Sequence, residues 1–328
     1  MPPSRRRPGD TSRPTPRDLP TVVRYDSERR AVIARRVRRG ELRRVRRGRY
    51  VVPAPGDAGR GPALRREAGV LALAAAVAES LRTDYWFSHE TAALLHGLAV
   101  YRLSDRVHVT HAWKPPAPAG RDDRLVRHPI RLPERDRTVV DARPVTTLER
   151  TTIDCARWLP GVQALVVADS ALRAGADLAV VREVLAEASG RPGVRQARRV
   201  VELADVRAES PGESVVRWYL DEAGIDAPRL AVEVQTWRGQ AWIDLGWPEL
   251  RVGIEFDGAV KYSGGEYGDP RERLLAEKRR HDALTEAGWI LLRLTWQDLA
   301  DPDRLIRRVR RALADAGRRR RPGSAARS

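Results

Sequence analysis

A chain of 328 residues with 42% hydrophobic residues is long enough for more than one core, so we expect two globular units plus tails. Its net charge of +17 and pI near 11.0 indicate a polyanionic partner, with nucleic acid favoured over an anionic surface or an acidic protein. The longest apolar run, near residues 69–78, is about half a membrane span, and the charged N-terminus has no apolar signal core. We therefore expect no export and no membrane insertion.

Cys155 is the single cysteine of the chain, so no internal disulfide can form. Such chains are typical of reducing compartments, and we expect a cytoplasmic protein. Cys155 lies in the segment 151–159, which has helical spacing. A lone cysteine in an apolar helix is more often a small core residue than a nucleophile, and we interpret Cys155 in that way.

The basic charge is concentrated in residues 29–49, which hold eleven Arg against one Glu. A helical pattern over 27–39 ends at Gly40, and a turn at Gly48 leads into a strand. A basic helix followed by a β-wing is typical of winged helix-turn-helix proteins, so residues 21–56 are interpreted as a partial winged-helix-like module. The alternative is a solvated Arg-rich helix that only keeps the protein soluble. The candidate DNA-binding residues of this module are Arg35, Arg36, Arg38, Arg39, Arg43, Arg44, Arg46 and Arg47.

Residues 62–206 are predicted to be mostly helical, with strand-like segments within 106–146. Ser88 is predicted to cap a helix that begins at His89. His89 and His96 lie seven residues apart and do not form an HExxH motif, so we interpret them as core or surface histidines rather than metal ligands. No catalytic constellation is expected in this segment.

The strings "SHETAALLHGL" (88–98) and "VTTLERTTIDCARWL" (145–159) resemble the abortive-infection type IV antitoxin family. The resemblance covers most of residues 27–175 and implies a small winged helix joined to a larger segment. Only a proline-rich tail precedes residue 21, so the two helices expected before a recognition helix have no counterpart. The resemblance also implies a toxin protein as a partner.

Residues 208–316 are predicted to form an αβββαβ domain followed by a last helix. Ser210, Pro211 and Glu213 form a capping box at the start of the first helix. The strands and helices that follow are predicted at 231–237, 240–247, 251–258, 270–287, 289–296 and 302–316. We therefore expect an α/β (α+β) protein, with residues 1–20 and 317–328 as disordered basic tails.

The hairpin of this domain carries Asp244, Glu255 and Asp257. If the four residues 247–250 form its loop, Asp244 lies opposite Gly253 and shares a face with Glu255 and Asp257, while Ile243 and Phe256 share the other. Two carboxylates about 5 Å apart repel by roughly 3 kcal/mol at an effective dielectric near 20. Oxygen ligands on rigid strands suit Mg²⁺ or Mn²⁺ rather than zinc. The alternative is an alternating strand whose polar face is simply hydrated.

Asp244 followed after ten residues by Glu255, Phe256 and Asp257, and then by a helix and a strand, resembles the PD-(D/E)XK nuclease superfamily. Within it, the chain is similar to very-short-patch-repair-like endonuclease domains over residues 208–315. The resemblance implies a restriction-endonuclease-like fold in which Asp244 and Glu255 hold Mg²⁺ for phosphodiester hydrolysis. Asp257 occupies the position of the usual motif lysine and is kept as a candidate catalytic and metal-binding residue.

The remaining site candidates lie around this motif. Lys278 is the candidate catalytic lysine, with an ordinary exposed helix charge as the alternative, and Asp282 is a candidate to pair with it. Lys261 is a further candidate contact to DNA. The resemblance implies Glu213 as an additional metal ligand, although its capping-box role explains it equally well. Arg293 and Trp296 are candidate substrate contacts, with burial as the alternative for the tryptophan.

These features predict a Mg²⁺-dependent (or Mn²⁺-dependent) DNA endonuclease that acts in phage defence or DNA repair. The alternative is a non-catalytic DNA-binding regulator or antitoxin of a type IV toxin–antitoxin system, with DNA as its partner and a toxin protein as a second one. No membrane and no small-molecule cofactor is expected in either case.

Overall fold

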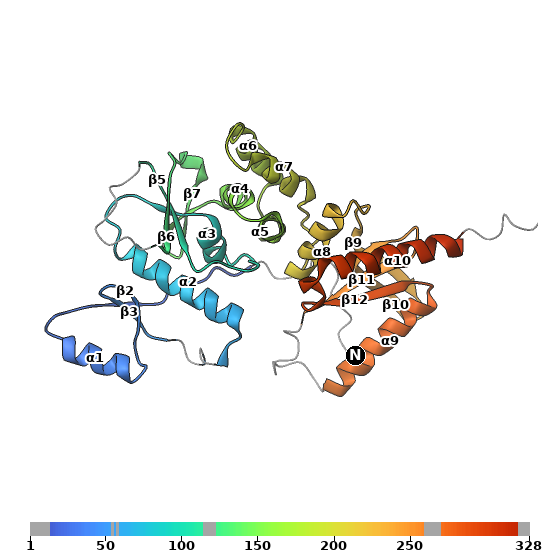
Figure 1. Ribbon diagram of the computed structural model, residues 1–328, viewed down its shortest axis with the longest axis horizontal. Coiled ribbons are helices and arrows are strands. Elements are labelled where there is room, and N and C mark those ends of the chain that lie inside the picture. Colours follow the sequence, from blue (N-terminus) through green and yellow to red (C-terminus); the bar gives the residue numbers. More distant parts are fainter. Residues whose placement is uncertain (1–13, 54–55, 57–58, 114–122, 259–269, 321–328) are drawn as a thin grey trace, which may run out of the picture. The chain divides into compact units, whose positions relative to one another are not determined.

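The computed structural model describes residues 14–320 except 54–55, 57–58, 114–122 and 259–269 (Figure 1). Helices alternate with strands of three β-sheets, which confirms the expected α+β class. The described residues divide into two compact units, an N-terminal unit up to Ala204 and a C-terminal unit from Asp205. None of the helices within these ranges is both long and apolar enough to cross a bilayer.

The N-terminal unit begins with a small antiparallel sheet of order β1-β3-β2. Its elements are β1 (Val22–Arg24), α1 (Arg30–Arg38), β2 (Arg43–Arg46) and β3 (Arg49–Val51). Gly48, with a φ of 69°, makes the tight turn of the β2–β3 hairpin. Val45 and Val51 of this sheet belong to the same core as Leu73 of the next helix, α2 (Pro62–Ala78). The basic segment therefore packs on α2 and is part of the N-terminal unit.

The rest of the N-terminal unit combines a five-stranded sheet of order β6-β5-β4-β8-β7 with five α-helices. Its strands are β4 (Trp86–Phe87), β5 (Val107–His111), β6 (Leu125–Pro129), β7 (Arg137–Val140) and β8 (Arg143–Thr146). Its helices are α3 (His89–Leu95), α4 (Leu148–Trp158), α5 (Gly161–Ala174), α6 (Leu178–Glu187) and α7 (Val194–Leu203). Cys155 is fully buried in α4, as expected for a core residue.

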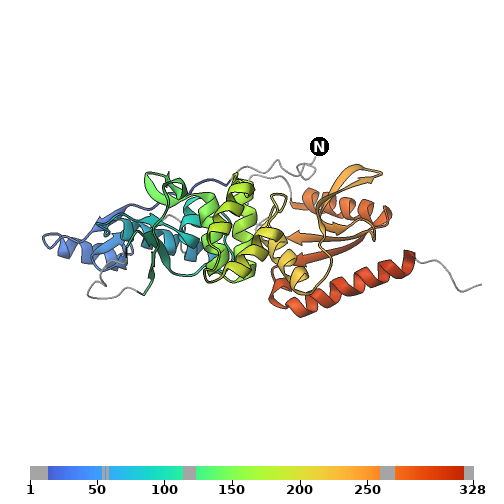
Figure 2. The same ribbon diagram turned by 90° about the horizontal axis from the view of Figure 1, so that it is seen from above.

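The C-terminal unit has the predicted order of elements around a sheet of order β12-β11-β10-β9. Its elements are α8 (Pro211–Glu222), β9 (Arg229–Thr236), β10 (Gly239–Trp247), β11 (Val252–Asp257), α9 (Pro270–Glu286), β12 (Ile290–Thr295) and α10 (Pro302–Arg320). β9, β10 and β11 are antiparallel, and β11 pairs in parallel with β12. Helices α8 and α10 cover one face of the sheet and α9 covers the other (Figures 1 and 2).

Helix α8 lies so close to the sheet that Gly212 has no room for a side chain. A Cβ built on Gly212 would lie 2.1 Å from Cε1 of the Phe256 ring. We expect Gly212→Ala to lower the free energy of unfolding by about 1–3 kcal/mol, because the ring must move. The matched control is Gly317→Ala in α10, where a Cβ meets nothing within 4 Å. Urea unfolding of both variants checks this, and equal stability of the two would contradict the close approach.

Candidate functional site

Glu213 lies in the first turn of α8 and forms the predicted capping box with Ser210. The Ser210 Oγ accepts from the Glu213 backbone N–H at 3.2 Å and donates to Oε1 of Glu213 at 2.7 Å. The backbone N–H of Glu209 donates to Oε2 at 2.9 Å. Burial, reinforced by the negative charge of Asp244, raises the pKa of Glu213 to about 8. Glu213 and Asp244 are therefore electrostatic neighbours, and Glu213 is mostly protonated at pH 7.

The β10–β11 hairpin has a different register from the expected one. Its pairs are Trp247 with Val252, Gly246 with Gly253, and Leu245 with Ile254. The loop is thus residues 248–251 rather than 247–250, and Asp244, one residue beyond the last pair, comes level with Glu255 instead of Gly253. The Asp244 Oδ2 accepts a hydrogen bond of 2.8 Å from the backbone N–H of Phe256 in the neighbouring strand.

The prediction that Ile243 and Phe256 share one face was wrong. Ile243 packs with Leu284 of α9, whereas the Phe256 ring lies against Gly212 of α8 on the opposite face. The alternation of β10 is interrupted at Asp244, because the β9–β10 ladder has no pair between Ile243–Val232 and Leu245–Leu230. Ala231, which lies in that interval of β9, has a φ of 50°. A strict period of two does not survive such an irregularity.

Glu255 is buried, and two arginines compensate its charge. Arg280 of α9 forms a short hydrogen bond and ion pair with Oε1, and the same Nη2 donates to the Trp242 carbonyl at 2.6 Å. Arg293, the register partner of Glu255 on β12, places its Nε 3.9 Å from Oε2. The Asp244 carboxylate thus lies toward Glu213 of α8, whereas the Glu255 carboxylate lies toward Arg280 of α9. The structure therefore does not bring these two carboxylates together on one face of the sheet, as the sequence predicted. Arg280 was not predicted, and its only sequence signal is its place in the charged helix.

The other predicted residues lie on α9, at the end of β11, just after β12 or outside the described residues. Lys278 is exposed on α9, two residues before Arg280 and so about 200° around the helix from it. Asp282 is also exposed, and Asp257 is half-buried at the end of β11. Trp296 is half-buried, and its ring packs edge-on against Phe256 at 5.0 Å. Lys261 lies outside the described residues.

The donor chemistry of Glu213, Asp244 and Glu255 suits a hard cation such as Mg²⁺. Without an ion, a proton neutralises Glu213 and the Arg280 guanidinium balances the charge of Glu255. Binding an ion here would therefore release the Glu213 proton and require Glu255 to leave Arg280.

The predicted DNA-binding arginines form a strongly cationic surface on α1 and the β2–β3 hairpin. Six of them are exposed, while Arg36 and Arg46 are half-buried. Arg36 and Arg39 contact one acid, Glu41, at 3.3 Å and 3.9 Å. The exposed six are Arg35, Arg38, Arg39, Arg43, Arg44 and Arg47. The helix and the hairpin thus both carry exposed positive charge.

A second group of titratable residues, not expected from the sequence, lies inside the N-terminal unit. Among the described His, Cys, Asp and Glu side chains, only His89, His108 and His128 form a group of three whose potential ligand atoms all lie within 4.8 Å of one another. Burial lowers the pKa of His108 to about 3 and that of His128 to about 4. His96 lies outside this group, with its Nε2 2.8 Å from the Thr146 carbonyl. Only the pairing of β5 with β6 and the packing of α3 bring the three together.

The fold and the site define a two-unit α+β protein with a buried acidic group in one unit and an arginine-rich surface in the other. No family model matches the chain. It is similar to two proteins of Mycobacterium tuberculosis, from strains CDC 1551 / Oshkosh and H37Rv, both named uncharacterized proteins. Each is 32% identical over 177 residues, which are 53% of this chain and 63% of the relative. The chain thus spans less than two thirds of their length, and neither name states an activity.

Proposed function

We propose that the C-terminal unit is a Mg²⁺-dependent or Mn²⁺-dependent endonuclease that hydrolyses phosphodiester bonds of DNA. The observation that carries this proposal is the position of Asp244, whose carboxylate accepts the Phe256 N–H and is an electrostatic neighbour of the buried Glu213. A buried carboxyl whose pKa is raised by burial and by a neighbouring acid is typical of functional sites. The αβββαβ order and the PD-(D/E)XK resemblance support the same reading.

Asp244 would hold the ion, with Glu213 as an additional ligand. Glu255 would join them after leaving Arg280 of α9, and Asp257 is a candidate at the strand end. When bound, Mg²⁺ supplies a Lewis acid that polarises phosphate and lowers the pKa of water. The chain's own contribution is orientation, because the Phe256 N–H fixes the Asp244 carboxylate. Arg280 and Arg293 are the cations nearest Glu255, and they are better placed than Lys278 to neutralise phosphate charge.

The arginine surface of α1 and the β2–β3 hairpin would hold DNA by its phosphates. Such binding weakens steeply with salt, because each phosphate contact releases counterions. The proposal assigns the protein to the cytoplasm, where it would cut DNA in phage defence or DNA repair.

Cleavage of supercoiled plasmid and single-stranded DNA in the presence of Mg²⁺, Mn²⁺ or EDTA tests the proposal. We expect metal-dependent cutting that falls at least about 100-fold in Asp244→Ala and Glu255→Ala, because each removes a metal ligand. The matched control is Glu249→Ala, which removes an exposed acid from the loop of the same hairpin. Cutting that persists in EDTA, or in both site variants, would overturn the assignment.

The second candidate is a non-catalytic DNA-binding regulator or antitoxin with a toxin protein as partner. The observation that favours it is the engagement of Glu255 by both Arg280 and Arg293, which gives its charge a structural partner without any ion. This candidate predicts salt-sensitive DNA binding with no cut products under any metal. Neutralisation of a toxin on co-expression would support the antitoxin form.

A further inference from the structure

The three histidines of the N-terminal unit come from an α-helix and two parallel strands. His108 on β5 and His128 on β6 point to the same side, because His108 pairs with Val126 and Thr110 pairs with His128. Nδ1 of His108 lies 3.0 Å from Nε2 of His128. His89, the first residue of α3, stacks on His128 at 3.8 Å between ring centroids. All three side chains are more than nine-tenths buried.

The outer nitrogens of two of the rings, those of His89 and His108, face oxygen groups of the kind that usually orient metal-binding histidines. Nδ1 of His89 lies 3.0 Å from the Ser88 hydroxyl, which leaves Nε2 of His89 for the cluster. Nε2 of His108 lies 3.7 Å from Oε2 of Glu90, too far for a hydrogen bond, and is a buried atom without a hydrogen-bond partner. A carboxylate or hydroxyl behind each ring is the usual second layer of a histidine metal site. The inner nitrogens are therefore Nε2 of His89, Nδ1 of His108 and Nε2 of His128, and these are the atoms that can bind a common ligand.

Local backbone and packing also point to this cluster. His89 has a φ of 54°, a strained conformation for a residue other than glycine. Ser88 stands at the N-cap of α3 but makes no side-chain cap hydrogen bond, contrary to the sequence prediction, and its hydroxyl lies against His89 instead. Trp158 of α4 packs edge-on against all three rings at centroid distances of 5.0–6.0 Å. About half of this tryptophan is exposed, so the cluster lies directly beneath the surface.

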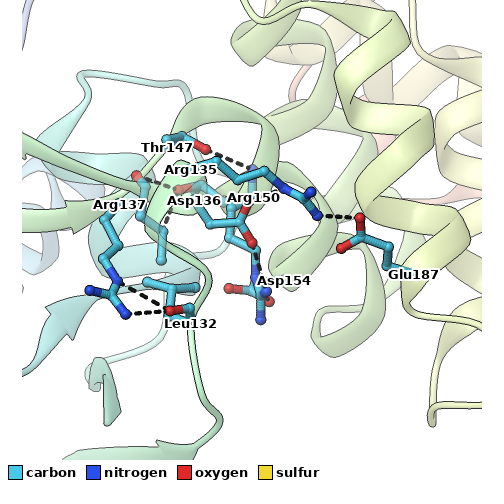
Figure 3. A network of polar contacts seen from close by, with 10 residues as sticks. Leu132, Arg135, Asp136, Arg137, Thr147, Arg150, Asp154 and Glu187 are labelled. Atoms are coloured by element: carbon cyan, nitrogen blue, oxygen red, sulfur yellow. Dashed lines mark hydrogen bonds and ion pairs between the residues drawn. The ribbon is translucent and has the colours of Figure 1, made fainter. Parts of the chain in front are cut away.

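Charged side chains of both signs lie around the histidine cluster. Arg150 and Arg157 lower the pKa of His128 in addition to burial, so positive charge faces the site from α4. Arg150 is itself held by Asp136 at 3.1 Å and by Asp154 at 3.0 Å (Figure 3). Glu90 supplies a negative charge behind His108.

We propose that His89, His108 and His128 form a binding site for one divalent transition-metal ion, with Zn²⁺ as the expected ion. Imidazole nitrogen suits Zn²⁺, and three protein ligands leave a fourth position for water. The rings of His89 and His128 are nearly parallel, at 15°, so binding turns them about χ2 until their lone pairs converge. The site is independent of the acidic group in the C-terminal unit and of the function proposed for it.

The test uses the full chain, freed of metal by a chelator and titrated with Co²⁺ and then Zn²⁺. We expect about one equivalent of Co²⁺ with the strong visible absorption of a four-coordinate site, displaced by Zn²⁺. His108→Ala and His128→Ala should each weaken binding at least about 100-fold, and Glu90→Gln should weaken it about 10–100-fold. The matched control is His96→Ala, a histidine outside the cluster. Asp244→Ala with Glu255→Ala should leave the spectrum unchanged.

X-ray absorption of the Zn²⁺-loaded wild-type protein keeps the test independent of whether the variants fold. We expect a zinc environment with three imidazole ligands, as the cluster provides. Absence of visible Co²⁺ absorption, or a zinc environment with fewer than two imidazoles, would overturn the proposal. Equal weakening by His96→Ala and His128→Ala would do so as well.

Discussion

Arg150→Ala is expected to lower the free energy of unfolding of the N-terminal unit by about 3–5 kcal/mol. Arg150 is buried between Asp136 and Asp154, which are both almost fully buried (Figure 3). Burial alone already raises the pKa of Asp154, and removal of the guanidinium leaves two carboxylates in a dry environment without a cation. Hydrogen exchange of α4, followed with denaturant, measures the loss.

The matched control for this prediction is Arg135→Ala. Arg135 pairs with Glu187 and its Nε also lies 3.7 Å from Oδ1 of Asp136, but the side chains of Arg135 and Glu187 are more than half exposed. An exposed pair of this kind contributes at most about 1 kcal/mol. If Arg150→Ala cost no more than Arg135→Ala, the buried triad would not be a stabilising element. Replacing all three members with apolar residues should recover much of the loss, because no charge is then left buried.

Glu213→Gln is expected to remove a pH dependence of up to about 5 kcal/mol from the stability of the C-terminal unit. The folded-state pKa of Glu213 is about 8, against an ordinary value of 4.5, so the folded protein binds more protons than the unfolded chain between these values. Stability therefore falls as the pH rises from about 4.5 to 8, and the penalty is complete above the folded-state pKa. Glutamine carries no charge and keeps a capping-box side chain.

Urea unfolding of wild type and Glu213→Gln at pH 5, 7 and 9 measures this difference. The wild type should lose stability relative to the variant as the pH rises, whereas Glu222→Gln, at an exposed position of the same helix, should follow the wild type. A difference that does not change with pH would mean that Glu213 ionises normally. Mg²⁺ added at pH 9 should restore stability to the wild type more than to Glu213→Gln, because the proposed ion takes the place of the lost proton.

The β10–β11 hairpin was predicted in part from the sequence. Alternating residues predicted both strands, but the register was wrong by two residues and the faces of Ile243 and Phe256 were wrong. The register error arises at the hairpin loop, which is residues 248–251 rather than 247–250. The error in the faces arises at Asp244, where the ladder to β9 is irregular and Ala231 adopts a positive φ. Neither residue type signals such a backbone conformation.

The positively charged residue that contacts Glu255 could not be predicted from the sequence. Lys278 was the predicted catalytic lysine, yet Arg280 is the residue that reaches Glu255. Two positions along α9 change the direction of a side chain by about 200°, and only the packing of α9 on the sheet fixes which direction faces the acid. The role of Arg280 follows from that packing.

The sequence by itself determined the order of elements in the C-terminal unit, the capping box at Ser210 and Glu213, the burial of Cys155 and the concentration of arginine in residues 29–49. These are local properties, since periodicity, caps and charge runs act within a few residues. Only the tertiary structure decided that His89, His108 and His128 meet, that Asp244 lies near enough to raise the pKa of Glu213, and that Arg280 compensates Glu255. Such contacts depend on strand pairing, register and helix rotation, which join residues far apart along the chain.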